Sequence, residues 1–540
     1  MTDEVASHGR DRVGRAAAVI TAWNLVSRIS GFVRVVATAS ALGIATLGDT
    51  YQRTNQVSNV LFELLAGGML FSVLVPSFVE ELQRGNQRAR DLAGALATRG
   101  VLLLGVVVTL GLVARRPLIE LLSSAASESS RQAQVDLGVF LLWFVLPQLL
   151  LYGAGAVVSA LLQADQRFAA VSMAPVVNNV IVTATMVAFA VVHDPARGLA
   201  LTGGEKLLLG GGTLIATAAM TVVPFTAASL AGLGLRPRWR AAPGTLGALA
   251  RRGLWGAGHV GVNQVLLLVT VVLAGQVDGG VIAYQTAFSF FLLPHALLAH
   301  PIFTALYPRL AREGTAGDLD GFGRDLRSGL RAITTLLAPA AAVLAVVAAP
   351  ALSLVRLGQL DADGTRLVAL VLAAYLVGAV GYSAFFLLTR ASYALGDARS
   401  PTLVNLTVTS GALAAMALVV HSFHGTAVLV AFGLVHAVST STGSLLLLGL
   451  IRRRTGRPVG IAASVARAAV TALAAGSAAL AVTASIGWES DLAAAAATVA
   501  ATAAGTLVAI ATLVLLRAPE IDLVRPRVAG LRARVRRRPS

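Results

Sequence analysis

Long apolar stretches, separated by short polar loops, recur along the whole chain. A helix needs about 20 mostly apolar residues to cross the hydrocarbon core of a bilayer. The apolar stretches are continuous and do not alternate with polar residues, which favours helices and excludes a β-barrel. The pattern predicts an all-α polytopic membrane protein with about 14 transmembrane helices, at residues of about 16–45, 55–80, 93–114, 135–162, 168–192, 207–234, 253–277, 279–308, 328–355, 367–389, 401–420, 425–451, 460–483 and 490–516.

Basic residues gather in alternate loops between these spans. Of the 43 Lys and Arg residues, 31 lie on the side of the membrane that holds the N-terminus and 8 on the other side. Cytoplasmic loops carry an excess of basic residues, so we expect a bacterial inner-membrane protein with both termini in the cytoplasm. The charged start, Met1 to Arg15, resembles a signal peptide. The apolar stretch that follows is too long for one and contains two arginines, so we expect it to be a retained span.

Two pairs of prolines indicate an internal repeat, although prolines also commonly end spans near loops. Pro76 and Pro308 lie 232 residues apart, and Pro175 and Pro401 lie 226 apart. The similar offsets predict two halves of six spans, related by an axis along the membrane normal. The expected parts are a cytoplasmic segment, an N-lobe of spans 1–6, a basic linker, a C-lobe of spans 7–12, spans 13–14 and a basic cytoplasmic tail, at residues 1–15, 16–235, 236–252, 253–451, 460–516 and 517–540.

The composition narrows the function classes. Charged residues make up 13% of the chain, about half the share of a soluble domain. The net charge of +17 comes from arginines in short loops, which indicates a membrane surface and no nucleic-acid partner. Cysteine is absent, the single lysine is followed by leucine, and no HExxH or Ser/His/Asp pattern occurs. We therefore expect a protein that is not an enzyme and holds no metal or cofactor.

The first span carries two charged residues near its middle, Arg28 and Arg34. On a helix they are separated by about 9 Å along the axis and about 120° around it, so they face one cavity if it is wide or if the helix bends at Gly31. A charge inside the membrane is costly without a cavity or a partner, and a guanidinium pairs well with phosphate oxygens. We expect these arginines to hold a phosphate or diphosphate; a structural ion pair with Glu63 or Asp49 is the alternative.

Polar residues of later spans complete the candidate site. They either line the same cavity or form hydrogen bonds between helices. Asn178 and Asn179 follow Pro175 and are expected to satisfy the backbone of a helix broken there. The candidate substrate-binding residues are Arg28, Arg34, Asp49, Arg53, Glu63, Asn263, Gln285 and Ser289.

Three stretches of sequence carry a family resemblance. SRISGFVR at residues 27–34, GGMLFSVLVP at residues 67–76 and ALYPRL at residues 305–310 resemble the MurJ (MviN) lipid II flippase family of the MOP exporter superfamily. The resemblance implies two six-helix lobes around a cationic central cavity, two further helices that form a groove for a lipid tail, and alternating access. It implies that Arg28 and Arg34 contact a diphosphate and that Asp49 is functionally important.

The sequence departs from the family pattern at several cavity positions. The family often has Asp at the position of Val35. Family members have arginines at the positions of Phe62, Glu63 and Ser289, so the implied cavity is less basic than in the family. The expected function is to flip a lipid-linked, diphosphate-bearing cell-wall precursor, resembling lipid II, from the inner to the outer leaflet. The alternatives are another MOP exporter, for polysaccharides or drugs, and a non-transporting scaffold for cell-wall enzymes. The expected partners are the lipid II-like substrate, anionic lipids at the basic tail and cell-wall synthesis proteins.

Reporter fusions after Ser540 test the predicted topology. We expect a C-terminal fluorescent protein, which folds in the cytoplasm, to be bright, and a C-terminal alkaline phosphatase, which folds in the periplasm, to be inactive. The basic residues on the N-terminal side are the physical reason. The opposite pattern would contradict the predicted model of fourteen spans with both termini in the cytoplasm.

Overall fold

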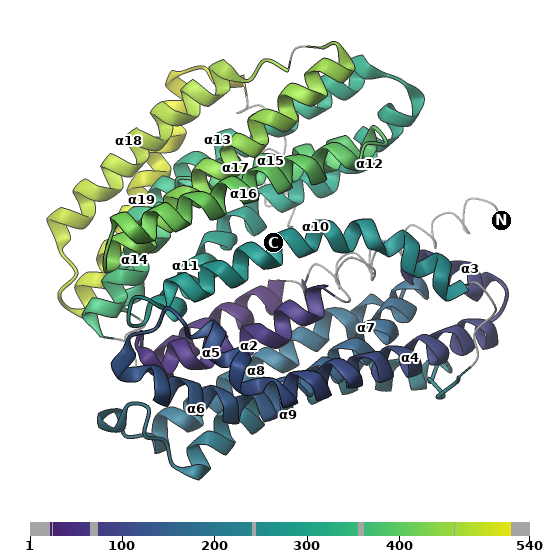
Figure 1. Cartoon of the computed structure of the whole chain (residues 1–540). Helices are drawn as coiled ribbons and strands as arrows, with labels where there is room; N and C mark the ends of the chain where they lie inside the picture. Colours follow the sequence, from purple (N-terminus) through teal and green to yellow (C-terminus); the bar gives the residue numbers. More distant parts are fainter. Residues whose placement is uncertain are drawn as a thin grey trace, which may run out of the picture. The chain divides into compact units, whose positions relative to one another are not determined.

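The structure is a computed structural model that describes residues 22–23, 25–64, 74–239, 245–354, 361–457 and 459–519, with the backbone alone for residues 245–259. Every regular element of these ranges is a helix, which confirms the all-α class (Figure 1). The expected segment 1–15, most of the motif at residues 67–76 and most of the basic tail lie outside the described residues.

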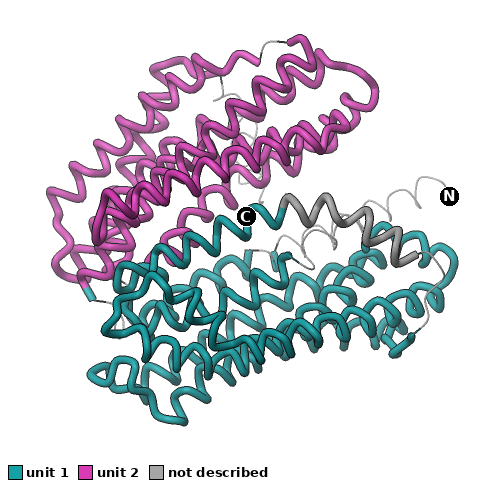
Figure 2. Tube along the Cα trace, viewed as in Figure 1, with its two compact units in different colours: residues 1–282, 357–361 teal, residues 283–356, 362–540 magenta. Residues whose placement is uncertain are grey.

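The chain divides into two compact units (Figure 2). Unit 1 comprises Met1–Ile282 and Leu357–Asp361, and unit 2 comprises Ala283–Arg356 and Ala362–Ser540. The division falls just inside α11, so α10 belongs to unit 1. The lobes expected at 16–235 and 253–451, and the symmetry between them, stay predictions.

Unit 1 begins with a helix at Leu25–Leu42, which we call the first helix. Its other elements are α2 (Thr46–Phe62), α3 (Val75–Gln83), α4 (Asn86–Val113), α5 (Arg115–Leu122), α6 (Glu128–Val145), α7 (Gln148–Ala164), α8 (Phe168–Val192), the 3-10 turn η3 (Pro195–Arg197), α9 (Gly203–Leu230), α10 (Thr245–Ala274) and the start of α11 (Gly280–Pro294).

Unit 2 contains the rest of α11 and eight further α-helices in its described part. A π-helical turn, η4 (His295–Ala299), connects α11 to the next helix. The others are α12 (His300–Ala316), α13 (Leu319–Ser353), α14 (Ala362–Leu376), α15 (Ala379–Ala394), α16 (Arg399–Ser422), α17 (Thr426–Thr455), α18 (Ala462–Ile486) and α19 (Asp491–Leu515).

The helices agree with the predicted spans in place but do not establish their number. In the described chain 11 helical segments are long and apolar enough to cross a membrane, and α14 with α15, bent by 48°, makes up to 12. The expected span at 55–80 falls on α2 and α3, between which residues 65–73 lie outside the described residues. The span at 253–277 falls on α10, whose described apolar part is Val260–Ala274. Fourteen spans therefore stay a prediction.

Small residues let the helices of both units approach closely. In unit 1, a Cβ added to Gly212 of α9 would lie 2.3 Å from the Thr185 side chain of α8. In unit 2, α18 and α19 pack on α13, where Ala475 and Ala501 are fully buried and a Cβ at Gly505 would lie 2.5 Å from Val343. Close packing of this kind holds helices together in lipid, where burial of apolar surface gives little driving force.

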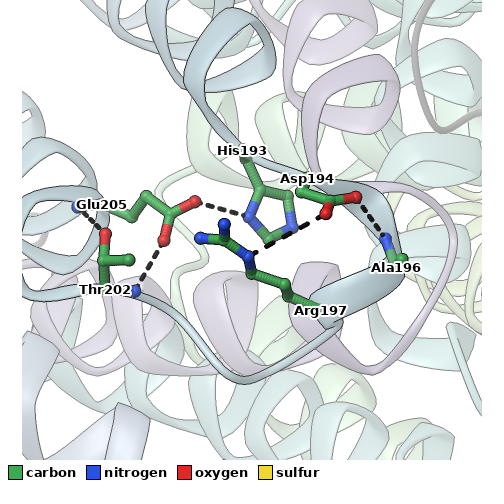
Figure 3. Close-up of polar contacts among 6 residues, drawn as sticks. All are labelled: His193, Asp194, Ala196, Arg197, Thr202 and Glu205. Carbon is green, nitrogen blue, oxygen red and sulfur yellow. Dashed lines mark hydrogen bonds and ion pairs between the residues drawn. The ribbon is translucent and has the colours of Figure 1, made fainter.

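A buried hydrogen bond between a histidine and a glutamate closes the loop between α8 and α9 (Figure 3). Glu205 accepts from the backbone N–H of Thr202 at 2.6 Å, and the Thr202 hydroxyl accepts from the Glu205 N–H at 3.3 Å. This capping box starts α9. The other carboxylate oxygen of Glu205 lies 2.9 Å from Nδ1 of His193, whose side chain is fully buried. The pair thereby ties the end of α8 to the start of α9.

Removing the Glu205 carboxylate should destabilise unit 1. Glu205→Ala leaves His193 and the Thr202 amide without their acceptor, which we expect to cost about 1–3 kcal/mol. Thermal unfolding of the purified protein in detergent measures the loss. Arg197→Gln is the control, because Arg197 is exposed and lies 3.9 Å from Asp194; we expect at most about 0.5 kcal/mol for it. Equal effects of the two variants would contradict a structural role for the buried pair.

Candidate functional site

The first helix carries the two arginines that the sequence analysis selected. The helix continues without a break through Gly31. Arg28 is exposed and Arg34 is half-buried. The Nε atom of Arg34 is enclosed and has no hydrogen-bond partner among the described groups. Arg34 therefore retains hydrogen-bonding capacity at a partly enclosed position.

The expected alternative, a structural ion pair for these arginines, is not formed within the described part of the chain. Glu63 lies exposed at the end of α2, and no described acid pairs with Arg28 or Arg34. Asp49, the other proposed partner, bonds elsewhere. The two guanidinium groups thus have no described counter-charge in contact with them.

Asp49 binds the N-terminus of α11. Its side chain is 3% exposed, and its Oδ1 atom accepts from the backbone N–H of Ile282 at 2.9 Å. Ile282 is the third residue of α11, and the first amides of a helix have no partner within it. A carboxylate at this end also complements the helix dipole. Asp49 therefore fixes the start of α11 against α2.

Arg53 lies one turn after Asp49 on α2 and is buried, with 2% exposure. Its Nη1 atom donates to Oε1 of Gln134 at 2.6 Å and to Oγ of Ser123 at 3.1 Å. Gly275, after α10, leaves the room that the guanidinium occupies, because a Cβ there would lie 2.4 Å from Nη2. The structure gives Asp49 and Arg53 protein partners, and contact of either with substrate stays a prediction.

The remaining candidates lie in α2, α10 and α11. Glu63 and Asn263 are exposed in unit 1. Gln285 and Ser289 are half-buried in unit 2, and the Ser289 hydroxyl donates to the backbone oxygen of Gln285 at 2.8 Å. Their role in binding stays a prediction.

One contact of the first helix was not anticipated. Asn179 does not repair a broken helix, because α8 continues through Pro175. Its amide instead donates to Ser30 on the first helix. The sequence showed Asn179 as a polar residue within a membrane span. It did not show that its partner is Ser30, 149 residues away.

The fold is that of transporters of the MOP superfamily. Over 94% of this chain it matches a structure described as "Lipid II flippase MurJ, inward closed conformation", all of which is covered, with a TM-score of 0.74 and 15% identity. A multidrug resistance MATE family transporter of the MOP superfamily, in an inward-facing conformation, matches 82% of this chain and 98% of its own, with a TM-score of 0.63 and 12% identity.

The sequence comparisons identify the family within that class. The chain belongs to the lipid II flippase MurJ family, which it matches over residues 38–520. It is 27% identical over 403 residues to the lipid II flippase MurJ of Burkholderia cenocepacia, covering 73% of this chain and 76% of that protein. It is also 27% identical to a probable lipid II flippase MurJ of Vibrio cholerae, covering 72% of this chain and 74% of that protein.

Family membership confirms the resemblance found in the sequence. The family is one of transporters, not enzymes. Together with the apolar helices, it makes the chain a multi-pass protein of the inner membrane.

Removing the Asp49 carboxylate should loosen the start of α11. In Asp49→Ala the Ile282 amide loses its acceptor in a buried place, so we expect a loss of about 1–3 kcal/mol in stability. Hydrogen–deuterium exchange of peptides that cover residues 280–286 should become faster. Asp278→Ala is the matched control, because Asp278 is an exposed acid of the same turn. Unchanged exchange in Asp49→Ala would contradict the capping role.

Proposed function

We propose that this chain moves a lipid-linked, diphosphate-bearing cell-wall precursor of the lipid II type from the inner to the outer leaflet by alternating access. The observation that carries the proposal is the pair Arg28 and Arg34, within a membrane helix and without a described acidic partner. Membership of the lipid II flippase MurJ family supports the same substrate.

The chemistry of the two arginines favours an anionic ligand. A cationic side chain within a membrane helix is expensive unless water, a ligand or a partner compensates it. A guanidinium offers a planar fork of donors that pairs two phosphate oxygens at once. The exposed guanidinium of Arg28 and the unsatisfied Nε of Arg34 supply such donors. We propose that they hold the diphosphate of the substrate while its lipid chain stays in the bilayer.

The other candidate residues would act around this pair. We propose that the polar side chains of Glu63, Asn263, Gln285 and Ser289 face the head group. Asp49 and Arg53 would shape the wall of the same site through their buried contacts with α11 and α6.

Orientation and partners belong to the same proposal. The excess of basic residues on the N-terminal side supports cytoplasmic termini. The tail at residues 517–540 would bind anionic lipid head groups of the inner leaflet through its arginines. Cell-wall synthesis proteins would receive or deliver the substrate.

A drug exporter is the second candidate, since the MATE family transporter shares the fold. The charge of the first helix opposes it for cationic drugs, because two uncompensated arginines repel a cation. A non-transporting scaffold for cell-wall enzymes is the third candidate. Such a scaffold binds no phosphate within the membrane, so arginines without acidic partners in a membrane helix do not support it.

Alanine substitutions test the phosphate role of the arginines. Arg28→Ala and Arg34→Ala should each lower delivery of lipid II to the outer leaflet by at least about 100-fold, since charge-assisted bonds to phosphate are lost. The measurement is rescue of cells depleted of their own flippase, with labelling of lipid II at the outer surface. Lysine at either position should restore little if bidentate pairing matters, and most of the activity if charge alone matters.

Arg99→Ala is the matched control. Arg99 also lies within a membrane helix, but its Nη2 atom donates to the backbone oxygen of Trp239 at 2.8 Å. We expect this variant to transport normally. If both arginine variants of the first helix also transport normally, the phosphate role is wrong. If they support growth without moving lipid II, the chain is a scaffold.

A further inference from the structure

A polar contact joins α8 to the part of the first helix that carries the two arginines. The side-chain amide of Asn179 donates to Oγ of Ser30 at 3.0 Å and to the backbone oxygen of Ser27 at 3.3 Å. The Ser30 hydroxyl in turn donates to the same Ser27 oxygen at 3.1 Å. Asn179 is buried, with 7% exposure, although it lies within a membrane helix. The three groups therefore satisfy one another between two helices.

This contact lies at one end of an apolar seam. Val182, Met186 and Phe189 follow Asn179 on the same face of α8 and are buried in a core with Ala41 and Leu42 of the first helix. Helical spacing puts Ser30, Arg34 and Ala41 on one face of the first helix. The apolar seam thus fixes the helix beyond Arg34, and Asn179 fixes it before Arg34.

We propose that Asn179 is a positioning residue for substrate. It holds the segment from Ser27 to Arg34 against α8, which fixes the rotation of the first helix about its axis and its position along that axis. Arg28 and Arg34 therefore meet the phosphates in one defined orientation. The inference rests on the proposed function of the arginines. Asn179 acts through the helix and does not touch substrate.

The geometry explains why a single side chain has this effect. Within the described residues, Asn179 supplies the side-chain hydrogen bonds between α8 and this end of the first helix, and the exposed residues Leu25 and Ile29 lie close by. Without the amide, this end of the helix is free to rotate or to separate from α8. A displacement of the two guanidinium groups lengthens their charge-assisted hydrogen bonds to phosphate and so weakens binding.

Transport assays in reconstituted vesicles compare two adjacent asparagines. Asn179→Ala should raise the apparent KM for lipid II about tenfold and leave the maximal rate within about twofold, as expected for the loss of positioning hydrogen bonds. Asn178→Ala is the matched control, because Asn178 is half-buried and its side chain forms no hydrogen bond with a described residue; it should behave as the parent. Ser30→Ala should resemble Asn179→Ala, and the double variant should be no worse than either alone.

A distance measurement tests the positioning directly, independently of transport. The chain has no cysteine, so Val33→Cys on the first helix and Val187→Cys on α8 give two unique labelling sites, both exposed. Double electron–electron resonance between spin labels at these two sites should give one narrow distance distribution. Adding Asn179→Ala should broaden or shift it, and adding Asn178→Ala should not.

The outcomes separate this inference from the proposed function. If Arg28→Ala and Arg34→Ala transport normally, the phosphate role fails, whatever the asparagine does. If those variants are inactive while Asn179→Ala keeps the parental KM and distance distribution, the positioning role is wrong. Asn179→Ala can also lower the yield of folded protein. If the folded fraction then keeps the parental distance between the labels at positions 33 and 187, the positioning role is wrong in that case too.

Discussion

A polar group enclosed among apolar helices must find a partner, because leaving it unsatisfied costs several kcal/mol. This constraint explains several contacts between segments of unit 1. Glu205 is held by Thr202 and His193, and the Nη1 atom of Arg53 by Gln134 and Ser123. Each set joins segments that apolar packing alone would leave free to slide, since apolar contacts have no direction. The polar contacts therefore set which residues face one another across the helices.

The polar contacts depend in turn on small residues. Gly275 leaves space for the Arg53 guanidinium, and Gly212 allows α9 to lie directly on Thr185 of α8. A larger side chain at either position would push the backbones apart and lengthen the hydrogen bonds nearby.

Hydropathy predicted most helices, because a long apolar run determines both the secondary structure and the lipid environment. It predicted less well where apolar character is interrupted: α14 and α15 form a bent pair, and α2 ends at Phe62 in the middle of one expected span. The site residues were harder still. Asp49 and Arg53 were among the expected site residues, but their partners lie 233 and 81 residues away. No local pattern encodes such a pairing, since it results from the folding of the whole unit.

The structure gives two arginines of unit 1 acceptors from distant parts of the chain. Arg53 and Arg99 each donate to a group brought from a distant part of unit 1, Gln134 and Trp239 respectively. The chain therefore can build protein acceptors for arginines where it needs them. It builds none for Arg28 and Arg34 within the described residues, although Glu63 is an acid of the neighbouring helix α2. A phosphate ligand would compensate them in the way that Gln134 and Ser123 compensate Arg53, and it would do so only while the substrate is bound.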